Sequence, residues 1–213
     1  VDDIKYGEDA EITVILPNDA TGHVDVTVNG KHYGNVSVEE GIAKLTLSGL
    51  SGGDYEVTID YSGDDKYVAN STSVKFNVAP LTPTIKIEVV DIMYGEIEVL
   101  NVTVNAPGSV NITVDGITIE IPLDEGVETT DVLAAINSPN YNGKATWNLI
   151  NLPMGVHKAF ASYNGNENYT SVNTSDVFHV FGNVDHVEIN VPDVSVGENA
   201  VISVEYPSDA TGN

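Results

Sequence analysis

The sequence contains no cysteine and no arginine among its 213 residues. Without cysteine there are no disulfides, thiolate metal ligands or thiol nucleophiles, so packing alone must hold the fold together. Lysine and arginine together number 8, against 32 aspartate and glutamate residues, and the formal net charge is −24. Nucleic-acid binding needs a cationic surface, so we exclude that function. We also expect no contact with an anionic membrane from this segment.

Long apolar runs and catalytic motifs are absent as well. No stretch of about 18 apolar residues suggests a membrane-spanning helix, and no signal peptide opens the sequence. We expect any export signal or anchor to lie outside it. The five histidines lack metal-ligand spacing, and there is neither a G-x-S-x-G motif nor a phosphate-binding loop. We therefore predict no enzyme activity, no catalytic residue and no cofactor.

Internal repetition is the main positive feature. "GEDAEITVILPNDATG" at Gly7 recurs as "GENAVISVEYPSDATG" at Gly197, and "YGEDAEITVI" at Tyr6 aligns with "YGEIEVLNVT" at Tyr94. Residues 45–67 align with residues 147–169 in the same way. Such self-similarity is typical of tandem repeats. We predict module one over 1–79 with a truncated first strand, a Pro-stiffened linker over 80–83, module two over 84–181, and the start of a third module over 182–213.

Each module has the pattern of a β-sandwich. Apolar and polar residues alternate, as at Val24, Val26 and Val28, and Asn-Gly and Gly-Gly turns separate the short segments. The predicted fold class is all-β, with tandem immunoglobulin-like antiparallel β-sandwiches. We expect core positions to correspond between modules: Leu47 with Leu149, Leu50 with Leu152, and Phe76 with Phe178.

Three aromatic residues are assigned to structural roles. Tyr61 and Tyr163 are placed like the tyrosine corner of such sandwiches, where the hydroxyl bonds backbone across a turn. Trp147 aligns with Leu45 and is predicted to face the core.

Module two carries extra residues, predicted as an insertion over 117–146. We expect a short helix over 131–136, capped by Thr129 or Thr130. This helix would either cover a sheet edge or form a binding loop.

The segments "GEDAEITVILPNDATGHVDVTVNGKHY" and "YSGDDKYVANST" resemble the bacterial Ig-like group 3 repeat family. More narrowly, they are similar to tandem repeats of adhesin-like surface proteins of methanogenic archaea. The resemblance covers module one along its length, and in module two the first and last strands. It implies an extracellular stalk and brings no catalytic residues.

Modification and ion sites have modest support. Asp64 and Asp65 lie in a glycine turn and are weak calcium candidates, although no calcium-loop motif is present and we assign no metal site. An isopeptide bond is not expected, because Lys75, Lys86 and Asn77 should point outward. Six N-x-S/T sequons predict glycosylation. They lie at Asn35, Asn70, Asn101, Asn111, Asn168 and Asn173.

These observations predict a structural repeat segment of an extracellular, cell-surface adhesin-like protein that forms a stalk or surface fibre. The alternative is a carbohydrate-binding module that attaches cells to surface glycans. The expected partners are neighbouring copies, arranged head to tail. Since residues 183–213 supply a first strand that residues 1–79 lack, we expect the tail of one chain to lie beside the head of another and not to fold back on module two.

Overall fold

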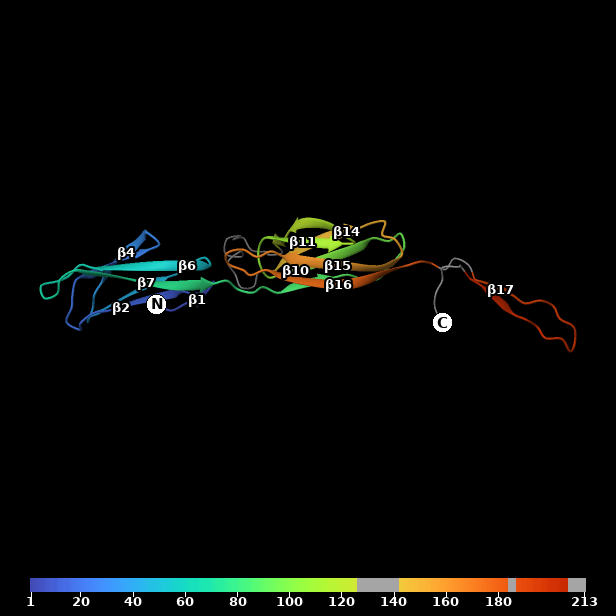
Figure 1. Ribbon diagram of the computed structural model, residues 1–213, viewed down its shortest axis with the longest axis horizontal. Helices are drawn as coiled ribbons and strands as arrows, with labels where there is room; N and C mark the ends of the chain where they lie inside the picture. The colour runs from blue at the N-terminus through green and yellow to red at the C-terminus, as the bar shows by residue number, and fades with distance from the viewer. Residues whose placement is uncertain (126–141, 184–186, 207–213) are drawn as a thin grey trace.

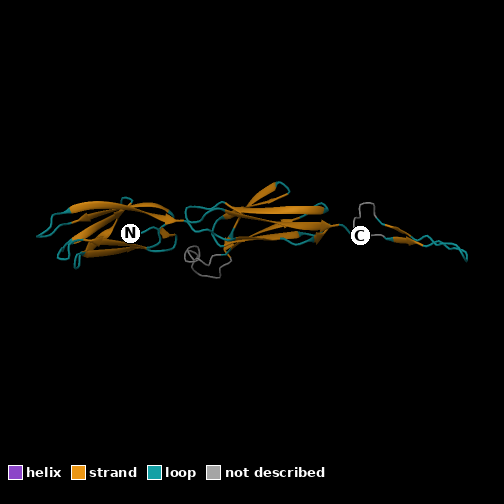
Figure 2. Cartoon of the chain, turned by 60° about the horizontal axis from the view of Figure 1, so that its bottom comes forward, coloured by secondary structure: helices purple, strands orange, loops and turns teal. Residues whose placement is uncertain are grey.

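The computed structural model describes residues 1–125, 142–183 and 187–206 (Figure 1). All regular structure in these ranges is β-strand, and none of the described residues is helical (Figure 2). The prediction of an all-β chain is therefore confirmed. Within the described ranges, no helix has the length and apolar character needed to cross a membrane.

The first sandwich comprises residues 1–79 and has its own hydrophobic core. One sheet has the order β1-β7-β6-β3-β4, and the other pairs β2 with β5. Alternating side chains from both sheets meet in this core, as Val24, Val26 and Val28 of β3 do. The strands are β1 (Ile4–Lys5), β2 (Ala10–Ile15), β3 (His23–Val28), β4 (Lys31–Ser37), β5 (Ile42–Leu47), β6 (Gly53–Tyr61) and β7 (Asn70–Ala79).

The second sandwich is formed by the described residues between 84 and 181, namely 84–125 and 142–181, and encloses a separate core. Its sheets have the orders β12-β11-β15-β16-β9 and β13-β14-β10-β8. The first of these repeats the five-stranded sheet of the first sandwich strand for strand, including the parallel pairing of its edge strand. The strands are β8 (Ile85–Glu88), β9 (Ile92–Met93), β10 (Glu98–Val104), β11 (Ser109–Val114), β12 (Ile117–Pro122), β13 (Asp124–Glu125), β14 (Gly143–Leu149), β15 (Gly155–Tyr163) and β16 (Val172–Phe181).

The predicted core correspondence is observed in both sandwiches. Leu47, Leu149, Phe76 and Phe178 are buried in their respective cores, with Phe178 fully covered. The third pair agrees less closely, because Leu50 is buried whereas Leu152 is only partly buried against the second core. Trp147 packs against that core from a half-buried position.

Strand β8 makes the main difference between the sandwiches. It pairs with β10 and places Ile87 opposite Val102, which is fully buried. The corresponding edge of β2 has no paired strand among the described residues. Val14, the counterpart of Val102, is accordingly only partly buried. The edge of β2 therefore presents unpaired backbone groups.

Residues 187–206 form a hairpin beyond the second sandwich (Figure 1). Strands β17 (Glu188–Asn190) and β18 (Ser203–Glu205) pair with Ile189 opposite Val204. This register reproduces that of β8 and β10, where Ile87 lies opposite Val102. The hairpin does not fold back on the second sandwich, as expected, and its residues are exposed. Pairing with another copy stays a prediction.

The structure narrows the predicted insertion over 117–146. Residues 117–122 form β12, which pairs antiparallel with β11 as β4 pairs with β3, except that the β3–β4 register shifts between Val26 and Thr27. Residues 143–146 belong to β14, the counterpart of β5. Both ends are thus strands shared by the two sandwiches. The helix predicted over 131–136, with Thr129 or Thr130 as its cap, lies outside the described residues, and no described residue supports a helical insertion.

Candidate functional site: the junction between the sandwiches

A tyrosine corner organises the end of each sandwich, as predicted. The Tyr61 hydroxyl donates to the backbone oxygen of Thr21 at 2.7 Å. The Tyr163 hydroxyl donates to the backbone oxygen of Pro107 at 2.9 Å. Each bond satisfies a buried hydroxyl and ties the end of one strand to the residues that precede its neighbour, β3 or β11.

The turn after each of these tyrosines is held by backbone hydrogen bonds to one side-chain oxygen. In the second sandwich, Asn166 Oδ1 accepts from the backbone nitrogens of Asn168 and Tyr169 at 2.8 and 3.0 Å. The Asn166 nitrogen donates to the Tyr169 oxygen at 2.8 Å. Gly165 has φ +77°, a conformation that favours glycine. The turn therefore presents Glu167 to Thr170 in a fixed conformation.

Asp64 holds the corresponding turn of the first sandwich. Its Oδ1 accepts from the nitrogens of Lys66 and Tyr67 at 2.8 and 2.7 Å, and its Oδ2 accepts from Thr21. The backbone donors of Thr21, Lys66 and Tyr67 hold the pKa of Asp64 well below its usual range. The carboxylate is thus committed to backbone donors, which explains why neutral Asn166 can take its place. Asp65 is exposed, and the described residues hold no group of three or more potential metal ligands.

The linker is hydrogen-bonded to the second sandwich. The Leu81 nitrogen donates to the Asn168 oxygen at 2.9 Å, and the Thr170 nitrogen donates to the Leu81 oxygen at 2.8 Å. The Thr170 hydroxyl reaches the Thr82 hydroxyl at 3.1 Å. Pro83 is buried. Residues 80–83 therefore run alongside the turn as a short parallel bridge and are not a free tether.

Gly52 brings the first sandwich into direct contact with the same turn. Its nitrogen donates to Asn168 Oδ1 at 2.8 Å. A Cβ at Gly52 would lie 1.8 Å from the backbone oxygen of Glu167, a distance that no side chain tolerates. Gly52 is absent from the residues with positive φ, so the close approach, and not backbone conformation, explains the glycine.

Two tyrosines complete the junction. The rings of Tyr6 and Tyr169 meet edge to face, with centroids 5.5 Å apart and planes at 69°. Tyr6 packs against both cores, and Tyr169 is 4% exposed. Burial raises the pKa of Tyr169. Edge-to-face pairs contribute about 0.5–1.5 kcal/mol beyond burial, so this contact favours one arrangement of the two sandwiches.

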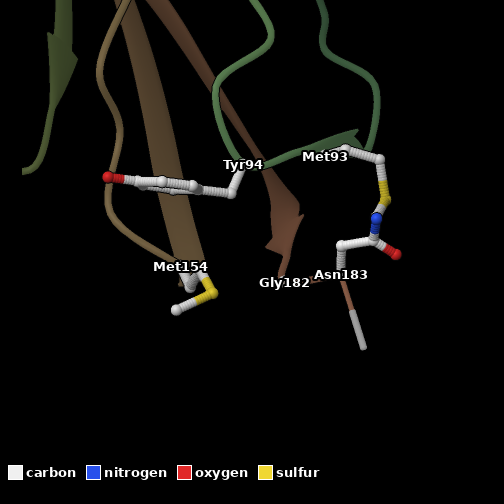
Figure 3. A pocket seen from close by; sticks show the side chains of 5 residues that line it. All are labelled: Met93, Tyr94, Met154, Gly182 and Asn183. Carbon is white, nitrogen blue, oxygen red and sulfur yellow. The ribbon is translucent and has the colours of Figure 1, made fainter. Parts of the chain in front are cut away.

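A pocket lies at the far end of the second sandwich, around the residues that correspond to the junction (Figure 3). Met93 ends β9 and Tyr94 follows it, Met154 precedes β15, and Gly182 and Asn183 follow β16. The cavity measures about 340 Å³. In Figure 3, Tyr94 lies near Met154, and Met93 lies beside Asn183.

The six sequons occupy different environments. Asn35, Asn70 and Asn173 are exposed on β4, β7 and β16. Asn101 and Asn111 alternate with buried residues and are partly exposed, so both face away from the core. Asn168 differs, because its side chain is a hydrogen-bond acceptor in the junction.

Neither lysine considered for an isopeptide bond is buried. Lys75 and Lys86 are exposed, and the Lys86 ammonium pairs with Glu88. Asn77 Nδ2 donates to Asp54 Oδ1 at 2.8 Å. These three side chains point away from the core, as expected, so the geometry for an isopeptide bond is missing at these positions.

The second sandwich buries one carboxylic acid and one imidazole among its described residues. Glu98 is fully buried; its Oε1 accepts from the Val90 nitrogen at 2.9 Å, and its Oε2 has no hydrogen-bond partner within the described residues. Burial raises the pKa of Glu98. His157 contacts Asp115 Oδ2 at 2.6 Å and the Pro153 oxygen at 2.8 Å. Burial lowers the His157 pKa, but these two acceptors raise it by more, so the net shift is upward.

Sequence reasoning missed the roles of Gly52 and Asn168. From the sequence, Gly52 belongs to a Gly-Gly turn and Asn168 to a sequon, and neither pattern indicates a contact between the sandwiches. The sequence does carry one signal: the alignment places Gly52 over Met154, a large change of side-chain size next to a glycine, Gly53 or Gly155, that both modules share.

Comparison with known proteins gives a family match for part of the chain. Residues 2–79 match the model of the bacterial Ig-like domain (group 3). The family resemblance inferred from sequence is thus supported over the first sandwich. No curated protein matches the chain.

Several solved structures are similar to the chain at low identity. The fibronectin(III)-like modules of Clostridium thermocellum CbhA are 14% identical, with 85% of this chain and 89% of that chain covered and a TM-score of 0.32. The tandem Ig domains of titin are 12% identical, with 85% and 93% covered and a TM-score of 0.30. Latent PorU from Porphyromonas gingivalis is 11% identical, with 97% and 25% covered and a TM-score of 0.37.

Proposed function

We propose that this chain is a structural segment of an adhesin-like, cell-surface protein, in which Ig-like sandwiches follow one another in tandem as a stalk. The junction carries the proposal. A linker hydrogen-bonded at Leu81 and Thr82, a glycine that admits a neighbouring backbone, and an edge-to-face tyrosine pair keep two sandwiches end to end. A spacer needs this property, because a flexible tether would let the units collapse onto each other.

The surface chemistry supports an extracellular location. The charge of −24 favours solubility and keeps neighbouring molecules apart. Asn35, Asn70 and Asn173 are exposed in sequons, so the folded protein can carry glycans at these positions. The match of residues 2–79 to a bacterial Ig-like domain supports the same location. We assign no catalytic step and no cofactor to the chain. The similarity to surface proteins of methanogenic archaea, inferred from the sequence, is part of this proposal.

Antibodies against the chain test the proposed location. Intact cells of the source organism should bind the antibody, and protease added outside should remove the signal. Labelling that appears only after lysis would contradict the proposal.

Glycan binding, the alternative function, stays a prediction: an array probed with the intact chain should show no selective binding if the role is purely structural.

A further inference from the structure

The end pocket of the second sandwich corresponds, residue for residue, to the surface that the first sandwich uses at the junction. Tyr94 takes the place of Tyr6, Met154 that of Gly52, and Asn183 that of Leu81 in the repeat alignment. At the junction this surface is covered by the turn Gly165–Thr170. At the end pocket it is open: Tyr94 is 62% exposed and Met154 is 53% exposed.

The matching turn is present in the first sandwich. The turn between β6 and β7, residues 63–68, has the same internal bonds as residues 165–170. Gly63 has φ +76° against +77° for Gly165. The Asp64 nitrogen donates to the Tyr67 oxygen at 2.8 Å, the same length as the counterpart bond. Figure 1 places this turn at the end of the first sandwich away from the junction.

We propose that the end pocket of one copy binds the β6–β7 turn of a second copy, with Tyr67 meeting Tyr94 as Tyr169 meets Tyr6. This inference rests on the proposed structural function and names the contact by which segments meet. Both rings are less covered than their counterparts: Tyr94 is 62% exposed where Tyr6 is partly buried, and Tyr67 is partly buried where Tyr169 is 4% exposed. At the junction the Thr170 nitrogen donates to the Leu81 oxygen. In the repeat alignment Val68 corresponds to Thr170 and Asn183 corresponds to Leu81, so their backbone groups can form the equivalent bond.

The contact differs from the junction in one respect. Gly52 admits the Glu167 oxygen at a distance that excludes a side chain, whereas Met154 has a long one. A thioether is flexible and packs well against an aromatic ring. At the junction the Glu167 backbone lies against Gly52, whereas at the end pocket the Met154 side chain fills the equivalent space. Lys66 replaces Asn168, so the side-chain bond to Gly52 has no equivalent and the docking is weaker.

Net charge opposes association between copies. Two chains of charge −24 repel each other at long range. Salt screens this repulsion over about 10 Å at 0.1 M. We therefore expect head-to-tail docking to strengthen as salt is added, which is the reverse of a contact held by opposite charges.

Cysteine trapping tests the proposal, and the absence of native cysteine makes it clean. Met154→Cys and Lys66→Cys chains are prepared separately, because these positions correspond to the contacting pair Gly52 and Asn168. The two are mixed under mild oxidation. The matched control replaces Lys66→Cys with Lys75→Cys, an exposed lysine on β7 outside the turn.

Docking should raise the effective concentration of the paired thiols, so the disulfide between Met154→Cys and Lys66→Cys should form about tenfold faster than in the control. Adding Tyr94→Ala to the Met154→Cys chain should return the rate to that of the control. Equal rates for the two pairs, or no effect of Tyr94→Ala, would overturn the proposal. Surface labelling of cells does not depend on this contact, so its result tests the proposed function separately.

Discussion

Replacing Gly52 with alanine should uncouple the two sandwiches without unfolding either. The added Cβ would lie 1.8 Å from the Glu167 oxygen, so the turn must move away. Because Gly52 is not among the residues of positive φ, alanine adds no backbone strain of that kind. The substitution therefore separates the close approach from the stability of the first sandwich.

The magnitude follows from the two direct contacts between the sandwiches. Moving the turn breaks the hydrogen bond from Gly52 to Asn168, worth about 1 kcal/mol. It also separates Tyr6 from Tyr169, worth about 0.5–1.5 kcal/mol. A total of about 2 kcal/mol lowers the ratio of docked to undocked sandwiches by roughly 30-fold.

Spin labels on two engineered cysteines measure this change. Ser73 and Ser175 are exposed, and they occupy equivalent positions on β7 and β16. The parent chain should give one narrow distance distribution, and Gly52→Ala should give a broad one. The matched control, Met154→Ala, changes the equivalent position at the other end and should leave the distribution narrow. A narrow distribution for Gly52→Ala would refute the role of close approach.

Three further predictions concern the cores and the modification sites. Phe76→Ala should destabilise the first sandwich by about 3–5 kcal/mol, because the ring is 3% exposed; a loss below about 1 kcal/mol in chemical denaturation would contradict its core position. The raised pKa values of Glu98 and His157 stabilise the fold only below their ordinary pKa values, and this contribution is lost as pH rises through the raised ones. Fluorescence of the single tryptophan should therefore report a higher melting temperature at about pH 5 than at about pH 8, and Glu98→Gln should reduce the difference, whereas an unchanged difference would argue against a titrating Glu98. Glycopeptide mass spectrometry of the native protein should find Asn168 unmodified, because its side chain is engaged at the junction, and occupancy there would contradict the docked arrangement.

The β-sandwich character could be predicted because it depends on residue patterns within single short segments. The alternation at Val24, Val26 and Val28 places these side chains on one face of a strand wherever the strand lies. The tyrosine corners were predictable for a similar reason, since Tyr61 and Tyr163 hold one place relative to the turns that follow them.

The bounds of the insertion could not be set by repetition alone. Residues 117–122 share few residue types with 31–37, although they form the counterpart strand. Their own alternation, with Ile117, Ile119 and Ile121, was the stronger signal. The alternation of apolar and polar residues therefore identifies strands that cannot be found by sequence similarity between the repeats.

The contacts at the junction could not be predicted from short sequence segments, because they depend on the surfaces of two separately folded sandwiches. Nothing within residues 51–53 indicates that a carbonyl of residue 167 approaches Gly52. Asp64 shows a related ambiguity: a carboxylate in a glycine turn suits either calcium or backbone donors. Asn166, which makes the same bonds without charge, favours the backbone role.

Small-angle X-ray scattering of the intact chain, over a range of salt concentrations, tests the central claim most directly. Two sandwiches held end to end should give an elongated particle, with a main peak in the distance distribution and a shoulder at the separation of the two units. Because the junction is made of backbone hydrogen bonds and a ring contact, this profile should be unchanged by salt once dimers are removed by dilution. A compact, single-peaked distribution, or one that contracts as charge is screened, would contradict the account.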